Sequence, residues 1–159
     1  MKIEISTTLK CSPEAVWEAV RTTQLFRYIT RPLLTFEPID PPTWPTVWDA
    51  GAYRCRIKFL GLVPLGSQTI DISFLAATGP EAAHPIYRVR DNGRGDLAKR
   101  WDHLITIEGT DQGTTQSTDR VEVEAGLLTP GVWAFAQLFY RYRQARWRRL
   151  VRHDFDYNA

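Results

Sequence analysis

Cysteine is scarce in this chain, and the motifs of the common metal and nucleotide sites are missing. Cys11 and Cys55 stand alone, with no CxxC motif and no histidine at metal-ligand spacing. The sequence has no P-loop, no GxGxxG, no GxSxG and no HExxH motif. We therefore predict no metal site and no cofactor, and we expect two buried free thiols rather than a disulfide.

Long apolar runs and a strong charge of either sign are also missing. No apolar stretch is long enough to cross a membrane, and residues 1–10 lack the apolar core of a signal peptide, so we expect a cytoplasmic protein. The 20 Lys and Arg residues nearly balance the 18 Asp and Glu residues, and the net charge of +2 argues against a nucleic-acid partner. Because there is no internal repeat and no low-complexity segment, residues 1–159 are expected to form a single domain.

Alternation of apolar and polar residues dominates the chain and is typical of β-strands. A strand is expected over residues 3–9, and Ser12, Pro13 and Glu14 have the N-cap, N1 and first-turn chemistry of a helix start. A second short helix is expected over residues 22–31. Six further strands are expected over residues 33–39, 52–62, 67–77, 85–90, 100–108 and 114–125, with turns at residues 63–66, 78–80, 91–95 and 109–113. This order predicts a seven-stranded antiparallel sheet, whose apolar face only the last helix is long enough to cover.

That last helix, expected over residues 129–153, is amphipathic and has two arginines on its apolar face. On a helical wheel of about 100° per residue, this face carries Val132, Phe135, Ala136, Phe139, Tyr142 and Leu150, with Arg143 and Arg146 among them. The other arginines, Arg141, Arg148, Arg149 and Arg152, fall on or toward the opposite side. An unpaired buried guanidinium is costly, so Arg143 and Arg146 must reach water, meet acids or line a wet cavity.

Two inward-facing polar residues are expected beside this helix. In residues 100–108 the bulkier alternate set contains Trp101 and His103, and in residues 114–125 the less solvent-like set contains Asp119. If the hairpin closes tightly around residues 109–113, His103 lies opposite Asp119. With Arg143 they would form a polar cluster in which the carboxylate raises the pKa of His103, as acid–base catalysis requires. The alternative is a structural network in which Asp119 merely neutralises an inward arginine.

The other inward positions predict an apolar and aromatic shell around this cluster. With the polar residues included, the predicted ligand-binding set is Tyr53, Ile57, Phe59, Ile72, Tyr87, Trp101, His103, Phe135, Phe139, Tyr142, Arg143 and Arg146. His103, Asp119 and Arg143 are the candidate catalytic residues within or beside this set.

Several segments resemble a known superfamily. TTLKCSPEAVWEAV resembles the opening strand and helix of the START/Bet v 1-like (SRPBCC) superfamily, and RWDHLITIEG, GTTQSTDRVEVEAG and FYRYRQARWRRL resemble the closing strands and helix of its bacterial polyketide cyclase/dehydrase-like branch. The resemblance covers nearly the whole chain and implies an α+β helix-grip fold, in which the sheet wraps around the long C-terminal helix and two short helices follow the first strand. It also implies ligand entry at one end of the sheet, where residues 40–48 are the predicted gate and residues 63–66 its neighbour. The alternative is that Trp44 and Trp48 only cap the sheet end.

Three classes of function stay open, because this fold hosts many chemistries. The first is binding of a hydrophobic or amphipathic small molecule, lipid-like or polyketide-like, in an internal cavity between the sheet and the C-terminal helix, with an acidic or carbonyl group meeting Arg143. The second is a cyclase or dehydratase in which His103 and Asp119 do acid–base work and Arg143 stabilises an enolate. The third is an interaction module whose Arg-rich helix face docks on an anionic partner, including peripheral contact with a membrane. The ligand and the oligomeric state stay open.

Overall fold

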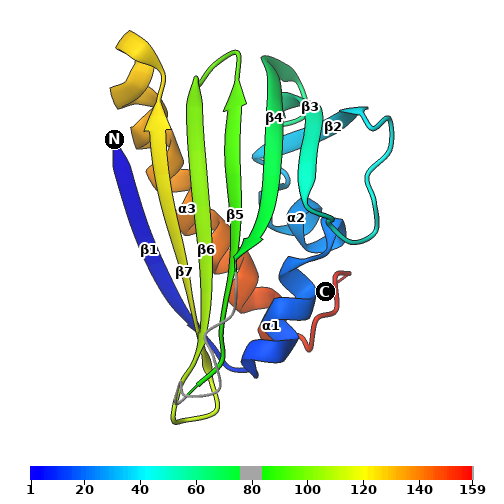
Figure 1. Cartoon of the computed structure of the whole chain (residues 1–159), viewed down its shortest axis with the longest axis vertical. Helices are drawn as coiled ribbons and strands as arrows, with labels where there is room; N and C mark the ends of the chain where they lie inside the picture. The colour runs from blue at the N-terminus through cyan, green and yellow to red at the C-terminus, as the bar shows by residue number, and fades with distance from the viewer. Residues whose placement is uncertain (76–83, 159) are drawn as a thin grey trace.

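The computed structural model describes residues 1–75 and 84–158, and they form one antiparallel sheet with a long helix across its concave face (Figure 1). The sheet has seven strands in the order β1-β7-β6-β5-β4-β3-β2. Their bounds are β1 Lys2–Leu9, β2 Leu34–Asp40, β3 Gly51–Phe59, β4 Val63–Leu75, β5 Ile86–Gly95, β6 Arg100–Gly109 and β7 Thr115–Glu124. Because β1 pairs with β7, the first and last strands of the chain lie side by side, and β1 and β2 form the two edges of the sheet. The predicted fold class is confirmed.

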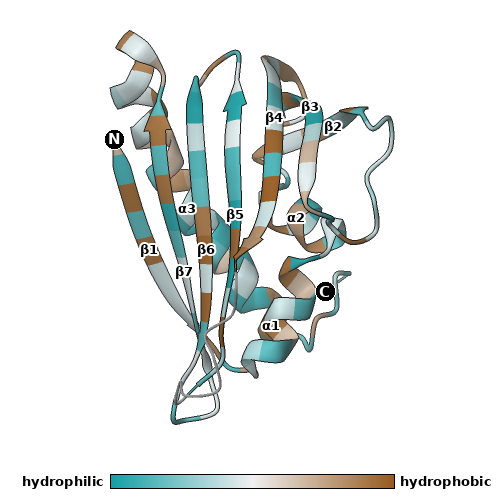
Figure 2. Ribbon diagram, in the orientation of Figure 1, coloured by the Kyte–Doolittle hydropathy of each residue, from teal (hydrophilic) through white to brown (hydrophobic). Residues whose placement is uncertain are grey.

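The inward side of the sheet is the side that the alternation indicates, and hydropathy alternates along the strands in Figure 2. In β7 every second residue is buried, and Asp119 belongs to the buried set with Val121 and Val123. In β6 His103 and Ile107 are buried on the same side. Side chains at every second position of a strand share one face, so each strand contributes a row of residues to the concave side.

Two short helices, α1 (Pro13–Val20) and α2 (Thr23–Thr30), follow β1 and cover one end of the concave face. The Ser12 Oγ accepts a hydrogen bond from the Ala15 amide at 3.3 Å, and the Thr22 Oγ1 accepts one from the Leu25 amide at 3.1 Å. These bonds satisfy amides that have no partner inside a helix, which is why both helices begin where they do. The second helix ends at Thr30, shortly before Pro32, because proline disfavours helical geometry in the residue that precedes it.

The long helix α3 (Thr129–Arg152) packs against only part of the concave face. It follows a 3-10 turn, η1 (Gly126–Leu128), and it contacts β1, β7 and α2 most closely. The backbones of β3, β4 and β5 lie farther from the helix, and side chains such as Phe59 of β3 and Phe135 of α3 meet across the space between them. Among the residues that the structure describes, no helix is both long enough and apolar enough to cross a bilayer.

Two predicted turns are strands instead. Residues 63–66 begin β4, and the preceding turn lies at Leu60 and Gly61, which have φ angles of 50° and 71°. Residues 91–95 complete β5, because Gly93 and Gly95 serve close strand contact rather than a turn. A Cβ on Gly95 would lie 2.5 Å from the carbonyl oxygen of Ser67, and one on Gly93 would lie 3.0 Å from that of Trp101. The predicted turn at residues 78–80 lies outside the described residues.

The two leucines Leu150 and Leu138 of α3 provide a matched test of this packing. Leu150 is fully buried in the core, whereas Leu138 is 70% exposed. We expect Leu150→Ala to lower the free energy of unfolding by about 2–5 kcal/mol, because it removes buried methyl groups and leaves a cavity. Leu138→Ala should change it by less than about 0.5 kcal/mol. Urea unfolding of both variants measures the difference, and equal losses would contradict the assigned face of α3.

Candidate functional site

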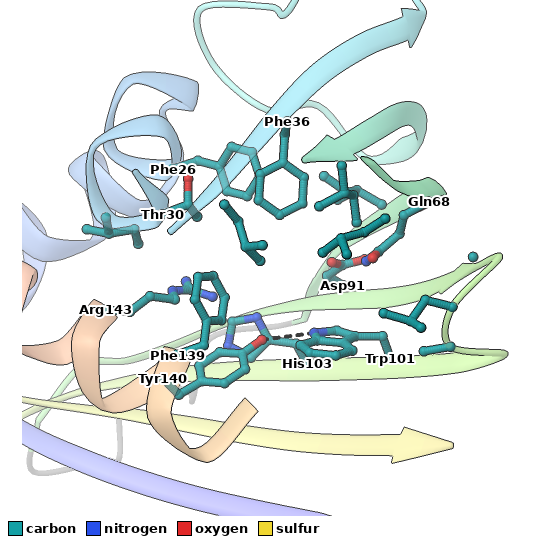
Figure 3. Close-up of a pocket in the computed structure, with 18 of the residues that line it drawn as sticks. Phe26, Thr30, Phe36, Gln68, Asp91, Trp101, His103, Phe139, Tyr140 and Arg143 are labelled. Carbon is teal, nitrogen blue, oxygen red and sulfur yellow. Dashed lines mark hydrogen bonds between the residues drawn. The ribbon is translucent and has the colours of Figure 1, made fainter. Parts of the chain in front are cut away.

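A cavity of about 380 Å³ lies between α3, α2 and the strands β3 to β6. Its wall is mostly aliphatic and aromatic, with a few polar groups (Figure 3). The apolar part includes Val20, Leu25, Phe26, Ile29, Leu34, Phe36, Trp48, Ile57, Phe59, Leu65, Ile70, Ile72, Val89, Leu97, Trp101, Ile105, Val132, Phe135 and Phe139. The polar side chains on the wall are Thr30, Ser67, Gln68, Asp91, His103, Tyr140 and Arg143.

The cavity opens at the end of the molecule where α3 begins. There its wall is formed by exposed or half-buried residues, including Leu65 in β4, Leu97 after β5 and Gly131 in α3. At its inner end the wall residues Leu25 and Ile29 are almost fully buried. A molecule that enters must therefore pass between the β3–β4 hairpin, the β5–β6 turn and the first turn of α3.

His103 and Asp119 are in direct contact, although the register differs from the prediction. His103 pairs with Val121, and Asp119 pairs with Ile105, so the two residues are diagonal neighbours on one face. The His103 Nε2 lies 2.7 Å from the Asp119 Oδ1, and the Gln144 amide donates to the other carboxylate oxygen. A register shift of two residues keeps both side chains on the same face, which is why the predicted contact survives.

The protonation of this pair follows from its burial. Burial lowers the pKa of His103, and its hydrogen bond to Asp119 offsets this only in part, so the imidazole is neutral at neutral pH. Burial raises the pKa of Asp119, but the hydrogen bonds and charges around it more than offset this, and its pKa lies below the ordinary value. The carboxylate is thus ionised and must accept from Nε2–H, which leaves the His103 Nδ1 as an acceptor. The expected rise in the pKa of His103 is wrong, because desolvation outweighs the carboxylate.

Arg143 lies on the cavity wall without the predicted ion pair. The residue is 8% exposed, and none of its nitrogens lies within 4.0 Å of a carboxylate oxygen among the described residues. Its Nε is buried and has no hydrogen-bond partner there. The guanidinium carbon instead lies 4.9 Å from the ring centroid of Tyr140 and 5.8 Å from that of Phe139, within the range of cation–π attraction. The predicted ion-pair contact between Asp119 and Arg143 is not formed, although the charge of Arg143 helps to lower the pKa of Asp119.

Tyr140 links this polar group to the aromatic wall, and the sequence analysis missed it. Its hydroxyl accepts a hydrogen bond from the Trp101 indole at 3.0 Å, and its ring lies 4.9 Å from that of His103 (Figure 3). Burial raises the pKa of Tyr140 above its ordinary value, so its hydroxyl keeps its proton. The oxygen can therefore also donate a hydrogen bond.

Asp91 is an acidic residue on the wall, and the sequence analysis missed it as well. Its Oδ1 accepts a hydrogen bond from the Asp71 amide at 2.8 Å. Burial raises the pKa of Asp91 to about 7, although the Asp71 amide and the charge of Arg143 both lower it. The sequence does contain a signal for the inward position of Asp91, because the inward alternation of Tyr87 and Val89 continues to it. The glycines of residues 91–95 concealed it, because that composition is typical of a hairpin turn.

The structure brings most of the predicted ligand-binding set to the cavity but leaves four residues outside its wall. Those on the wall are Ile57, Phe59, Ile72, Trp101, His103, Phe135, Phe139 and Arg143. Tyr53 hydrogen-bonds the backbone of Asp49, and Tyr87 stacks on Trp17 with ring centroids 5.0 Å apart. Both rings therefore belong to the surrounding core, and their predicted place on the wall is corrected.

Tyr142 and Arg146 are outside the wall because the buried face of α3 is rotated from its predicted centre. The buried positions include Tyr140, Gln144 and Trp147, which turns that face by about 50° away from Tyr142. The Tyr142 hydroxyl donates to the carbonyl of Arg31, and Arg146 lies over the ring of Tyr28 with its guanidinium carbon 3.9 Å from the centroid. Both predictions are corrected.

The predicted gate at residues 40–48 is a closed aromatic corner. Trp48 is 5% exposed and lines the cavity from inside, and Trp44 packs against Trp48 with centroids 5.4 Å apart. The Trp48 amide also donates to the Arg21 carbonyl at 2.7 Å, which ties the loop to α1. The alternative, that both tryptophans cap the sheet, fits this packing, whereas the neighbouring residues 63–66 do contribute Leu65 to the mouth.

The two cysteines are both free. Cys55 is fully buried, and burial raises its pKa to about 12, so its thiol is not a nucleophile at neutral pH. Cys11 is only half-buried, so the expectation that both thiols are buried holds for Cys55 alone. Among the described residues, no group of three or more His, Cys, Asp or Glu side chains could hold a metal ion.

The raised pKa of Asp91 makes a testable contribution to stability. An unfolded aspartate has a pKa near 3.9, so between about pH 4 and pH 7 the folded protein holds a proton that the unfolded chain releases. Stability from this group therefore falls as the pH rises through that window, by about 4 kcal/mol in total. Asp91→Asn keeps an oxygen for the Asp71 amide and cannot ionise. We therefore expect the difference in the free energy of unfolding, Asp91→Asn minus wild type, to increase from pH 4 to pH 8. Urea unfolding of both proteins measures it. A difference that stays constant with pH would show that Asp91 ionises normally.

No family model matches the chain, and no curated protein matches it. Several solved structures do match over almost their whole length. CV1439 from Chromobacterium violaceum has a TM-score of 0.62 at 15% identity and covers 94% of this chain and 96% of its own. A START superfamily protein from Mycobacterium smegmatis has a TM-score of 0.59 at 12% identity, with coverage of 96% and 97%. The Zhui aromatase/cyclase from Streptomyces sp. R1128 has a TM-score of 0.61 at 14% identity, with coverage of 96% and 93%.

Identities this low establish shared architecture and leave the chemistry to the residues of the site. TM-scores of about 0.6 over almost the whole length of both chains show that the sheet and the helix gripped by it are arranged as in these structures. The chain therefore has a helix-grip fold, which it shares with these structures, among them a START superfamily protein.

Proposed function

We propose that this protein binds an amphipathic small molecule in the cavity, with an acidic or carbonyl group of the molecule accepting hydrogen bonds from Arg143. The observation that carries the proposal is a buried guanidinium on an apolar wall with no carboxylate of the described residues within 4.0 Å. A buried charge is costly unless something pairs with it. A ligand that brings an acceptor oxygen to Arg143 removes that cost, so the free protein is prepared for such a group.

The rest of the wall suits the apolar part of the same molecule. A volume of about 380 Å³ falls within the range of small-molecule pockets, which are commonly about 300–1,000 Å³. The wall presents aromatic rings from α2, β2, β6 and α3, among them Phe26, Phe36, Trp101 and Phe139 (Figure 3). Removing an apolar ligand from water into this space supplies the main driving force, and Arg143 fixes its orientation.

Dodecanoate and dodecanol form a matched ligand pair that tests the role of Arg143. Arg143→Met keeps the side-chain stem and removes the guanidinium. A hydrogen bond between charged groups contributes about 1.5–3 kcal/mol, so we expect the variant to bind dodecanoate about ten- to hundredfold more weakly. Its affinity for dodecanol should change less than about threefold. Tryptophan fluorescence or calorimetric titration measures both constants.

Arg146→Met is the control, because Arg146 lies on the same helix but packs on Tyr28 outside the cavity. It should leave both affinities unchanged. If Arg143→Met lowers the affinities for dodecanoate and dodecanol equally, the guanidinium only shapes the cavity. The proposal fails if dodecanoate binds wild type and Arg143→Met equally.

A second candidate function, acid–base catalysis of a cyclase or dehydratase type, is favoured by the His103–Asp119 pair. The Nε2 to Oδ1 distance of 2.7 Å fixes the imidazole, and His103 is on the cavity wall. The unprotonated Nδ1 can then act as a general base toward a bound molecule, while Arg143 stabilises a developing enolate. The same geometry also suits a pair that only stabilises the fold. An observed reaction of a bound substrate is therefore needed to assign catalysis to this pair.

Incubation with a poly-β-ketone probe, followed by mass spectrometry of the extracted probe, separates carrier from enzyme. A catalyst should give a product that has lost water, and His103→Gln should slow its formation about 10²- to 10⁴-fold. His84→Gln is the control, because His84 is near the surface and paired with Asp111. If the probe binds and is recovered unchanged, the enzymatic candidate is excluded for this substrate class.

A further inference from the structure

Exposed aliphatic side chains gather around the mouth of the cavity. Leu62, Leu127 and Leu128 are 82%, 101% and 61% exposed, and Leu60, Val63 and Leu97 are also exposed. Single exposed leucines are ordinary on a protein surface. Here they lie in the β3–β4 hairpin and the β5–β6 turn, which border the mouth, and in η1, which directly precedes the first turn of α3.

Packing holds these three segments together at one end of the molecule. Phe59 at the end of β3 meets Phe135 of α3 with ring centroids 6.2 Å apart. The Asp96 carboxylate of the β5–β6 turn accepts hydrogen bonds from the amide and hydroxyl of Ser67 in β4, at 2.7 Å and 2.9 Å. The tips of all three lie at the upper end in Figure 1, and the C-terminal end of α3 lies far from them. We call these exposed aliphatic residues at the rim of the mouth the apolar collar: Leu60, Leu62, Val63, Leu97, Leu127 and Leu128.

A basic groove lies beside this collar. Arg54, Arg94 and Lys99 line it together with Ser67, Gly95 and Asp96, and all three cations are exposed. The Asp96 carboxylate is occupied by Ser67, and the Arg94 guanidinium reaches Asp71 only at 3.7 Å. The groove thus presents cations next to protruding apolar tips. That combination matches the surface of an anionic lipid bilayer, where apolar side chains enter the acyl region and cations meet the headgroups.

We propose that the collar docks the mouth of the cavity on an anionic lipid bilayer, so that an apolar ligand passes between bilayer and cavity without crossing water. The docking step stands on the exposed leucines and the groove. The passage of ligand rests on the proposed function as well, because it needs a cavity that accepts an amphipathic molecule. A second copy of the chain is the other occupant that an apolar rim could fit, and the experiment below separates the two.

Flotation with vesicles of equal parts phosphatidylglycerol and phosphatidylcholine tests the docking without any added ligand. We expect wild type to float with these vesicles and to float less with pure phosphatidylcholine vesicles. Leu62→Ser, Leu127→Ser and Leu128→Ser combined should lower vesicle binding at least about tenfold, because the tips no longer enter the bilayer. Leu138→Ser is the matched control, since Leu138 is 70% exposed in α3 and lies outside the collar, and it should bind as wild type does.

Two further measurements separate loss of membrane docking from loss of ligand binding and from binding through the far end of α3. Dodecanoate affinity of the triple variant in the absence of vesicles should equal that of wild type, so loss of docking and failure of ligand binding are distinguishable. Arg149→Gln with Arg152→Gln, on the exposed far end of α3, should leave vesicle binding unchanged. The proposal is overturned if wild type does not float, if the triple variant floats equally, or if only the arginine variant loses binding. A dimer in solution that the triple variant abolishes would assign the collar to a protein interface instead.

Discussion

One helix cannot fill the concave face of a seven-stranded sheet, and the rest of the structure follows from that constraint. The long helix α3 packs on β1, β7 and α2, whereas β3, β4 and β5 curve over it. Protein interiors are normally close-packed, so an unfilled volume of about 380 Å³ between these layers is a departure that needs a reason. The short helices α1 and α2 close one end of the space, and the other end remains open beside the start of α3.

The polar groups around this space divide into two kinds. Asp119 does not line the cavity, and its carboxylate is satisfied by His103 and Gln144, a network that stabilises one arrangement of β6, β7 and α3. Arg143 and Asp91 instead face the cavity, one without a hydrogen bond to its Nε and the other bonded to a single backbone amide. The first kind explains how the wall holds its shape. The second kind supports a molecule with a polar group bound among aromatic rings.

Much of the architecture could be predicted because it depends on local pattern. Alternation in β7 placed Asp119 inside, the Ser12 cap began the first short helix, and the apolar face of α3 included Arg143. The contact between His103 and Asp119 survived a wrong register, because a shift of two residues preserves the face.

What could not be predicted depends on packing between distant segments. Gly93 and Gly95 indicated a turn, but in the structure they allow neighbouring strands to approach closely, and Asp91 becomes part of the wall. The rotation of α3 that brings in Tyr140 and removes Tyr142 is set by contact with β1 and α2, which a helical wheel does not contain. The position of Arg143 beside the rings of Tyr140 and Phe139 could not be found from sequence, since it depends on how α3 is rotated against the sheet.

If Arg143 binds an acceptor oxygen inside an apolar cavity, a crystal structure with bound dodecanoate will show that contact. We expect electron density for the acyl chain among Phe26, Phe36 and Phe139. The carboxylate should lie within 4.0 Å of a nitrogen of Arg143, which is the distance limit for an ion pair. The chain should enter from the side of Leu65 and Leu97. A carboxylate that stays at the mouth while the Arg143 guanidinium has no contact with it, or an acyl chain bound outside the cavity, would contradict the account.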